Sequence, residues 1–162
     1  MFVYSVRAST IKFFALILGT LLLLITLVNI GDNNSVMASV GGVSVNFGGM
    51  RSNEDRVNFI ESFGIKVKTE PTEEGVFLAP ESLDRVSAEY NEIQKAQGLD
   101  LTKYTGKRIT HYKYEVENYN SDGAVYVNLL IYKNRVIGCD ISSTDGAGFV
   151  LPLVGIDKSN FS

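Results

Sequence analysis

Near its start the chain has an uncharged apolar run, and the remainder mixes polar and apolar positions. The run reads FFALILGTLLLLITLV at its centre, and with its flanks, residues 11–30, it matches the roughly 20 residues that a helix needs to cross a bilayer. Arg7 and Lys12 precede the run, and Asp32 is the first charge after it. Because positive charge is retained in the cytoplasm, we expect residues 1–10 to be cytoplasmic, residues 11–30 to be a transmembrane signal anchor and the remainder to be extracytoplasmic.

A cleaved signal peptide is the alternative interpretation of the same run. Val36-Met37-Ala38 offers small residues for a cleavage site, which would release a secreted domain near Ala38. The apolar run is, however, longer than the about 7–15 residues usual in a signal peptide. We therefore favour the uncleaved anchor, and both interpretations place the domain outside the cytoplasm.

The stretch after the anchor has no helical pattern of apolar positions. Residues 31–50 are first polar and then rich in glycine, with the pairs Gly41-Gly42 and Gly48-Gly49. Such composition is typical of a flexible linker. We expect this stretch to connect the membrane to the domain.

Residues 51–155 have the mixed pattern of one α+β domain, and a capping signal predicts its first helix. Ser52 stands three residues before Asp55, an arrangement in which each side chain bonds the other residue's backbone N–H at a helix start. Gly64 suits the left-handed conformation that ends a helix. The alternating stretch Ile65–Lys68 then predicts a short strand. The apolar side of the helix is formed by Val57, Phe59, Ile60 and Phe63.

A second short strand and a second helix follow. Pro71–Gly75 indicates a turn, and Val76–Leu78 a short buried strand. Pro80 suits the first turn of a helix because it has no N–H to lose, and Asp84 is favourable near the positive end of the helix. Gly98 ends the pattern. Apolar side chains recur at helical spacing and predict the side that faces the core: Leu83, Val86, Tyr90 and Ile93.

The last third of the domain predicts three strands. Residues 108–116 are rich in Tyr, Thr and Ile, and residues 135–142 return after the tight turn Lys133-Asn134. Residues 124–132 give the clearest strand, with Val125, Val127, Leu129 and Ile131 on one face. Strands joined by short turns form an antiparallel meander. We therefore predict an α+β fold of helix-strand-strand-helix followed by a three-stranded antiparallel meander, with both helices on one face and water on the other. Residues 156–162 would form a C-terminal tail.

Composition excludes several functional classes. The chain has 15 Lys and Arg against 18 Asp and Glu, and an acidic domain without a basic stripe is a poor partner for nucleic acid. A single Cys139 excludes an internal disulfide, and together with a single His111 it excludes Cys/His zinc sites. We expect no metal and no cofactor. Cys139 is predicted to be a buried, inert thiol, on a different face from His111, so a nucleophilic Cys–His pair is not expected.

Two acidic features carry candidate chemistry. The motif Asn118-x-Asn120-x-Asp122-Gly123 copies the start of a calcium loop, but its twelfth position is Leu129 in a strand, so a hairpin turn is the better explanation. Asp140 is the most prominent of the acids considered for acid–base catalysis, which also include Asp145 and Glu73-Glu74. A carboxylate that accepts hydrogen bonds from a neighbouring turn is the competing explanation for Asp140.

Tyrosine and amide side chains around the sheet give the strongest functional lead. One tyrosine ring offers apolar area and a hydrogen bond together, which suits stacking on a sugar or holding a peptide. Tyrosine also simply favours strands and pairs across them, so both explanations stay open. The candidate binding residues are Tyr90, Asn91, Gln94, Tyr112, Tyr126, Asn128 and Asp140.

Several stretches together resemble the bacterial domain of unknown function 4830 family. They are YNEIQKAQGLDL at 90–101, YTGK at 104–107, NLLIY at 128–132 and VIGCD at 136–140. The resemblance extends over about Asp55 to Leu153 and implies a small Firmicutes protein with one amino-terminal membrane helix or signal and one outer domain. The family tends to have Gly-Gly-Asp where this chain has Gly138-Cys139-Asp140. It has no assigned activity, so the resemblance implies no mechanism.

These observations favour a non-catalytic binding module at the cell envelope. Catalytic residue types are few, whereas aromatic and amide groups are abundant. The expected partners are the membrane, through the single-pass anchor, and a protein or cell-wall ligand. The alternatives are an envelope hydrolase that uses carboxylates, with Asp140 central, and a structural accessory subunit of a membrane complex.

Overall fold

The computed structural model describes residues 37–40, 42–121, 123–144 and 148–162. The predicted membrane segment, residues 11–30, lies outside these residues, as does the short N-terminus before it. Among the helices in the described part of the chain, none is long and apolar enough to span a membrane.

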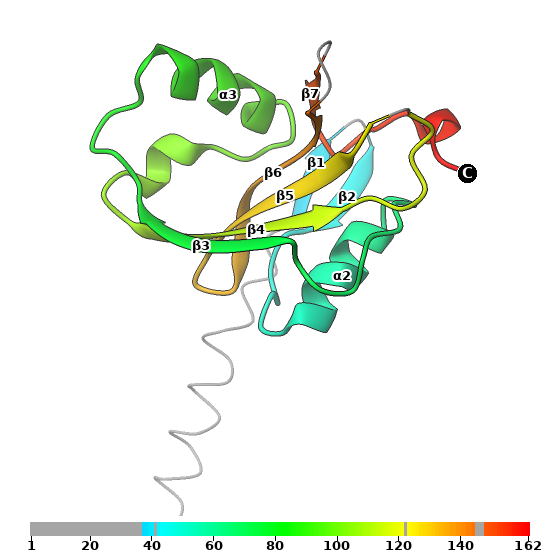
Figure 1. Ribbon diagram of the computed structural model, residues 1–162. Helices are drawn as coiled ribbons and strands as arrows, with labels where there is room; N and C mark the ends of the chain where they lie inside the picture. Colours follow the sequence, from blue (N-terminus) through cyan, green and yellow to red (C-terminus); the bar gives the residue numbers. More distant parts are fainter. Residues whose placement is uncertain (1–36, 41, 122, 145–147) are drawn as a thin grey trace, which may run out of the picture. The chain divides into compact units, whose positions relative to one another are not determined.

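A five-stranded antiparallel sheet forms the body of the domain (Figure 1). The result confirms an α+β fold with a meander. The strand predicted at Val76–Leu78 joins the meander on one side, and one strand that was not predicted joins it on the other. The hairpin between the strands Val125–Tyr132 and Arg135–Ser143 turns at Lys133 and Asn134, whose φ angles are 47° and 59°, as a two-residue type I′ turn requires. In spatial and chain order the strands are β3 (Glu73–Leu78), β4 (Arg108–Glu115), β5 (Val125–Tyr132), β6 (Arg135–Ser143) and β7 (Val150–Leu151).

Helix α2 (Asn53–Glu61) packs against one face of this sheet. The Ser52 Oγ accepts the Asp55 N–H at 3.1 Å, and the Asp55 Oδ2 accepts the Ser52 N–H at 2.8 Å, so the predicted capping box is confirmed. Alternation along β5 is confirmed as well, because every second residue from Val125 to Ile131 is buried. The main core lies between helix and sheet and includes Phe47, Phe59, Ile60, Ile65, Tyr114, Val127, Leu129, Cys139, Ile141 and Leu153.

Helix α3 (Arg85–Lys95) and the 3-10 helix η1 (Leu101–Tyr104) lie over the opposite face. A smaller apolar cluster joins that face to η1, and it contains Ala79, Ile109 and Ile137, with Leu101, Tyr104, Leu130 and Tyr132 packed against them. Ile109 and Leu130 alternate along their strands with main-core residues and therefore point to the other side. The prediction that both helices share one face was wrong, because the polar-looking side of β4 to β6 is apolar enough at one end to be covered.

The course of α3 also differs from the prediction. Asp84 caps the helix by accepting the Ser87 N–H at 2.8 Å, so Pro80 lies before the helix and not in its first turn. Of the predicted apolar stripe, Leu83, Tyr90 and Ile93 are half-buried, whereas Val86 is 73% exposed, so the prediction was wrong for Val86. The buried positions in and just after α3 are instead Asn91, Gln94 and Gln97.

The segment between the two helices contains one edge strand. The predicted strand Ile65–Lys68 is reduced to a single bridge between Val67 and Val116. The predicted strand at Val76–Leu78 is confirmed as part of β3, which begins earlier, at Glu73, within the predicted turn Pro71–Gly75. The prediction that this strand is buried was wrong, because all six residues of β3 are exposed. Within the described residues β3 pairs with β4 alone.

Part of the predicted flexible linker is folded. β1 (Met37–Val40) and β2 (Val43–Asn46) form a two-stranded antiparallel sheet. Phe47 and Met50 lie in the main core, and the Phe47 carbonyl accepts the Val136 N–H at 2.8 Å. The linker prediction was therefore wrong for these residues, since Gly48 and Gly49 lie between Phe47 and Met50, whose side chains anchor the segment in the core.

The predicted C-terminal tail also packs onto the domain. It contains the 3-10 helix η2 (Lys158–Asn160). The ring of Phe161 meets that of Tyr119 edge-on at 5.1 Å, and the Ser162 N–H donates to the Asn118 carbonyl at 3.0 Å. These contacts hold the chain end against the loop after β4.

Candidate functional site

A cluster of polar side chains lies on the α3 side of the sheet. The Tyr90 hydroxyl donates to the Asp140 Oδ2 at 2.7 Å, and the Asn128 Nδ2 donates to the Asp140 Oδ1 at 2.9 Å and to the Ser142 Oγ at 3.0 Å. The His111 Nε2 lies 3.0 Å from the Asn128 Oδ1. We call these five residues the Asp140 cluster.

Strand register explains how the cluster forms. Asn128 in β5 is directly opposite Asp140 in β6, and in an antiparallel pair opposite residues point to the same face. His111 in β4 is opposite Leu130, two positions from Asn128, and so shares that face. Tyr90 reaches the same point from α3. Three of the predicted binding residues, Tyr90, Asn128 and Asp140, are therefore brought together.

Burial dominates the electrostatics of the cluster. Asp140 is only 4% exposed, and this burial raises the pKa of its carboxyl, although the hydrogen bonds from Tyr90 and Asn128 oppose the shift. Burial and then the neighbouring Asp140 raise the pKa of the Tyr90 hydroxyl. Each oxygen of Asp140 already accepts a hydrogen bond from a neighbouring side chain. The carboxyl is thus suited to hold Tyr90 and Asn128 in place.

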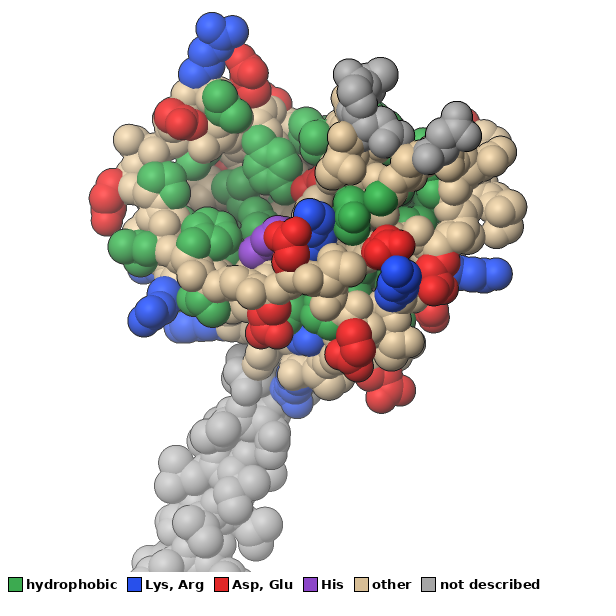
Figure 2. Space-filling view, in the orientation of Figure 1, with side chains coloured by type: hydrophobic (Ala, Val, Ile, Leu, Met, Phe, Trp, Pro, Cys, Tyr) green, Lys and Arg blue, Asp and Glu red, His purple; other side chains and the backbone are tan. Residues whose placement is uncertain are grey.

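An apolar hollow opens beside the cluster. It has a volume of about 180 Å³ and lies between α3 with its flanking segments and the sheet. Figure 2 shows hydrophobic side chains gathered around a depression in this region, between α3 and β3. Phe77 in β3 lines it while remaining 42% exposed. The complete lining is Phe77, Ala79, Pro80, Leu83, Ser87, Tyr90, Leu101, Thr105, Ile109 and Leu130.

Tyr126 lies on the same face as the cluster, farther along the sheet. The Lys113 Nζ is 4.4 Å from the centre of the Tyr126 ring and 2.7 Å from the Glu73 Oε1. This lysine is thereby engaged by a π face and a carboxylate at once. Tyr126 is part of this half-buried surface but not of the hollow.

Tyr112 does not belong to the site, although it was predicted there. It is opposite Leu129 and therefore faces the α2 side of the sheet. The Arg56 guanidinium lies 3.8 Å from the centre of its ring, and the Arg56 Nε donates to the Tyr114 hydroxyl at 2.8 Å. Tyr112 thus contributes to the packing of α2.

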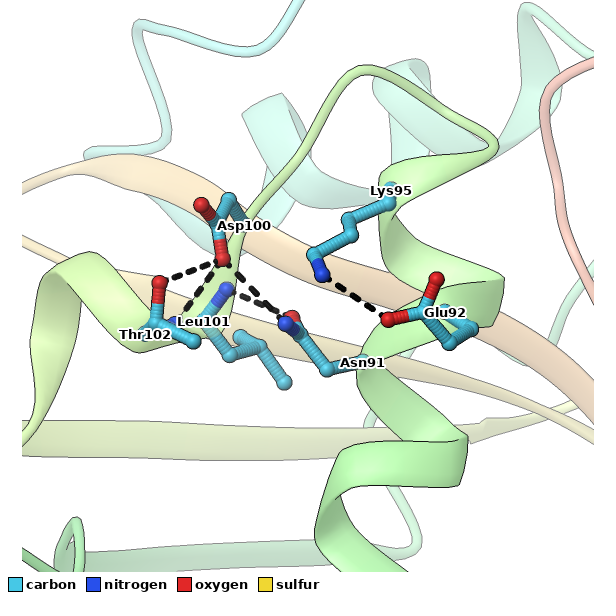
Figure 3. Close-up of polar contacts among 6 residues, drawn as sticks. All are labelled: Asn91, Glu92, Lys95, Asp100, Leu101 and Thr102. Carbon is cyan, nitrogen blue, oxygen red and sulfur yellow. Dashed lines mark hydrogen bonds and ion pairs between the residues drawn. The ribbon is translucent and has the colours of Figure 1, made fainter. Parts of the chain in front are cut away.

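Asn91, another predicted binding residue, connects α3 to η1 (Figure 3). Its Nδ2 donates to the Asp100 Oδ1 at 3.2 Å, and its Oδ1 accepts the Leu101 N–H at 2.7 Å. Asp100 also accepts the Thr102 hydroxyl at 2.7 Å. In Figure 3 the exposed pair Lys95 and Glu92 lies separately on the helix, at 2.8 Å. Asn91 therefore has a structural role.

Gln94 and its neighbour Gln97 cover the outer edge of β6. The Gln94 Oε1 accepts the Cys139 N–H at 2.8 Å, and the Gln97 Nε2 donates to the Cys139 carbonyl at 2.8 Å. The Gln97 Oε1 accepts the N–H groups of Leu153 and Val154 at 2.8 and 3.0 Å. Two amide side chains thus replace a neighbouring strand, and Gln94 is not available to a ligand.

The other residues with candidate chemistry have structural positions. Cys139 is buried in the main core, and burial raises the pKa of its thiol, while His111 lies on the opposite face. The Asn118 Oδ1 accepts the Lys66 N–H at 2.8 Å, and its Nδ2 donates to the Gly64 carbonyl at 3.2 Å. Asp122 and Asp145 lie outside the described residues. No group of three or more potential metal ligands occurs among the residues that are described.

A larger groove of about 850 Å³ lies on the α2 side of the domain. Its polar groups mostly serve the fold: Asp55 caps α2, the Ser62 hydroxyl donates to the Phe59 carbonyl at 2.6 Å and the Asn46 Oδ1 accepts the Gly48 N–H at 2.9 Å. None of the predicted binding residues lines it. We therefore place the candidate site at the hollow and the Asp140 cluster, despite the smaller volume.

The comparison with protein families matches the part of the chain that contains the hollow. The family described as a domain of unknown function (DUF4830) matches residues 59–141. The chain belongs to this family. The DUF4830 segment contains the whole lining of the hollow and all of the Asp140 cluster except Ser142, whereas most of the lining of the larger groove lies outside it. No curated protein and no solved structure matches the chain.

Part of the site was not predicted from the sequence, including Ser142, Phe77 and Leu83. Ser142 is two residues after Asp140, a spacing that places both on one face of a strand, and this signal was available. Phe77 and Leu83 were missed because both were predicted to be buried. Phe77 is 42% exposed and Leu83 is only half-buried, which depends on how far α3 lies from the sheet, and the sequence carries no signal for that distance.

Proposed function

We propose that this DUF4830 protein is a membrane-anchored, extracytoplasmic binding module that takes an apolar side chain of a protein partner into the hollow beside α3. The observation that carries the proposal is the exposure of Phe77, 42%, at a formed hollow. An apolar surface that a folded domain leaves open is a typical site of association.

The size of the hollow supports a protein ligand. Its volume of about 180 Å³ is below the roughly 300–1,000 Å³ of pockets that enclose small molecules. It suits a single aromatic or branched aliphatic side chain. The lining is mostly carbon, with Ser87 and Thr105 as polar members, which favours a peptide segment over a cell-wall sugar.

The polar cluster supports binding over catalysis. Tyr90 lines the hollow and is fixed by its hydrogen bond to Asp140. A ring held in one position contributes apolar contact with little loss of side-chain entropy on binding. The Asp140 cluster would therefore act as a rigid floor for the ligand.

The envelope location rests on the apolar run at residues 11–30 and on the position of Ala38. Ala38 pairs with Val45 in the hairpin of β1 and β2, so cleavage there would divide β1, which favours an uncleaved anchor. A reporter fused after Ser162 tests the location. Alkaline phosphatase should be active and green fluorescent protein dark, and the reverse result would contradict an extracytoplasmic domain.

Selection from a random peptide library on the immobilised full-length chain tests the binding function. We expect peptides with one aromatic or branched aliphatic anchor, whose binding is lost in Leu83→Lys and Phe77→Ser. Val150→Ser is the matched control, because Val150 is 45% exposed but lies on β7, away from the hollow. Binding that is equally weakened by all three changes, or by none, would contradict the proposal.

The raised pKa of Asp140 is the one observation that favours the alternative of a carboxylate hydrolase. Asp140→Asn decides between the two functions. A hydrolase would lose its cellular phenotype while the protein stays folded, whereas a binding module would keep peptide binding. An accessory subunit would instead depend on its anchor, and exchange of residues 11–30 for an unrelated span would abolish its co-purification with the complex.

A further inference from the structure

The two edges of the five-stranded sheet are treated differently by the fold. On the side away from β3, the outer groups of β6 are engaged: the Val136 N–H donates to the Phe47 carbonyl, Cys139 bonds Gln94 and Gln97, and Ile141 and Ser142 pair with the two-residue strand β7, which forms that edge. The other edge, β3, has no such cover among the described residues. Open edges are usually protected by charged side chains, proline or a bulge. In β3 the two charges, Glu73 and Glu74, lie at the start of the strand, and Gly75–Leu78 contains neither a charge nor a proline.

Backbone direction shows which groups of β3 point outward. The Ala79 N–H donates to the Lys107 carbonyl, and the Val116 N–H donates to the Val125 carbonyl. Because bonding direction alternates along an antiparallel strand, Phe77 and Gly75 bond β4, and Val76 and Leu78 direct their N–H and carbonyl groups away from the sheet. Val76 and Leu78 are also 60% and 67% exposed.

We propose that β3 pairs antiparallel with β3 of a second copy of this chain, about a two-fold axis at Val76. In this register Val76 is opposite its own copy, and the outward backbone groups of both strands are satisfied. Such pairing uses the same surface on both partners and closes after two copies. The product is a continuous ten-stranded sheet without an open β3 edge.

The side chains of β3 are complementary in this register. Phe77 falls opposite Gly75 of the second copy, so the ring covers the gap that glycine leaves. Glu74 falls opposite Leu78 of the second copy, whose neighbour in β4 on the same face is Arg108. Arg108 has no ion-pair partner within the described part of the chain. Each dimer therefore gains two carboxylate–guanidinium pairs across its interface, and no two like charges are opposite each other.

The inference does not rest on the proposed function, since the pairing uses the outward backbone groups of β3, although Phe77 contributes to both the pairing and the hollow. In membranes that contain the full-length chain, Val76→Cys tests it directly. Opposite residues of a hydrogen-bonded pair have Cα atoms about 5.5 Å apart, within the about 4.4–6.8 Å that a disulfide spans. Val86→Cys on α3 is the control of comparable exposure, and the native Cys139 is buried.

On mild oxidation we expect Val76→Cys to form a disulfide-linked dimer at least about tenfold faster than Val86→Cys, because a held pair reacts at a much higher effective concentration. Equal rates would overturn the proposal. A cross-link from Val76→Cys to a different protein would overturn it as well and would identify β3 as the docking strand for another chain.

Two further experiments test the dimer. One exchanges the charges of Glu74 and Arg108, and the other measures the mass of the unmodified chain. Glu74→Arg and Arg108→Glu should each lower dimer formation several-fold, and the double variant should restore it. The unmodified full-length chain in mild detergent should have the mass of a dimer by light scattering, and Val76→Pro, which removes one outward N–H, should have that of a monomer. A monomeric unmodified chain, or single reversals without effect, would contradict the two-fold pairing.

Discussion

The hydroxyl of Tyr90 donates a 2.7 Å hydrogen bond to the carboxylate of Asp140, 50 residues farther along the chain. This contact joins α3 to the centre of β6 and fixes the ring that lines the hollow. It also buries a carboxyl, and the hydrogen bonds that it accepts, first of all those from Tyr90 and Asn128, offset the loss of water only in part. The stability of this region should therefore depend on pH.

Asp140→Asn removes the buried titrating group. Burial raises the pKa of Asp140 in the folded chain above its ordinary value of 3.8, so the folded state binds the proton more tightly than the unfolded state. The stabilisation from protonated Asp140 is complete below pH about 4 and is lost as the pH rises through the raised pKa. In urea titrations from pH about 3 to about 7, the free energy of unfolding of the wild type should fall relative to that of Asp140→Asn.

Asp157→Asn provides the control with the opposite sign. Its hydrogen bonds with Ser159 lower the pKa of the Asp157 carboxyl, so its contribution is present at neutral pH and is lost as the pH falls. The wild type should therefore gain stability relative to Asp157→Asn as the pH rises. The same slope in both variants would show that Asp140 is not the group responsible.

Gln97→Met should be strongly destabilising. It leaves the N–H groups of Leu153 and Val154 and the carbonyl of Cys139 without their partner, and each unsatisfied buried group costs about 1–3 kcal/mol. We expect the free energy of unfolding in urea to fall by more than about 3 kcal/mol. Lys95→Met, at an exposed position of α3, should change it by less than about 0.5 kcal/mol. Similar losses in the two variants would contradict a bridging role for Gln97.

Gly138→Ala tests how closely η1 and β5 approach β6. A Cβ at Gly138 would lie 3.0 Å from the Leu130 Cδ1 and 3.3 Å from the Leu101 Cδ2. Such overpacking typically costs about 1–3 kcal/mol, and Leu130→Val in the same chain should restore part of the loss. At Gly75 a Cβ meets nothing within 4 Å, so Gly75→Ala should leave the thermal midpoint unchanged or slightly raised. Equal effects at both glycines would contradict this packing.

Lys133→Asn should stabilise the hairpin of β5 and β6. Lys133 has a φ of 47°, a left-handed conformation that costs most side chains roughly 1–2 kcal/mol and that asparagine adopts more readily. We expect a higher thermal midpoint by calorimetry. Lys107→Asn makes the same chemical change at an exposed position without a positive φ, and it should not raise the midpoint. A gain in both variants would point to charge instead of backbone conformation.

The sequence predicted best where the signal is local. Ser52 and Asp55 form a capping box within one turn, so three residues are enough to recognise the start of α2. Alternation along β5 and the turn at Lys133-Asn134 likewise depend on neighbours in the chain. The family could also be recognised from short motifs, since the DUF4830 match spans the residues that carry them.

Tertiary structure decided which polar side chains are buried and which residues share a face, because both depend on the backbone groups that each side chain contacts. In the sequence, Gln94 and Gln97 have the pattern of the polar side of a helix. They are nevertheless buried, because they satisfy the outward N–H and carbonyl of Cys139. Tyr112 and Asn128 could be placed on one face or on opposite faces only once the register of β4 and β5 was fixed. Likewise, the strand-forming Val76–Leu78 fits either a central or an edge strand, and only the order of strands in the sheet leaves it exposed.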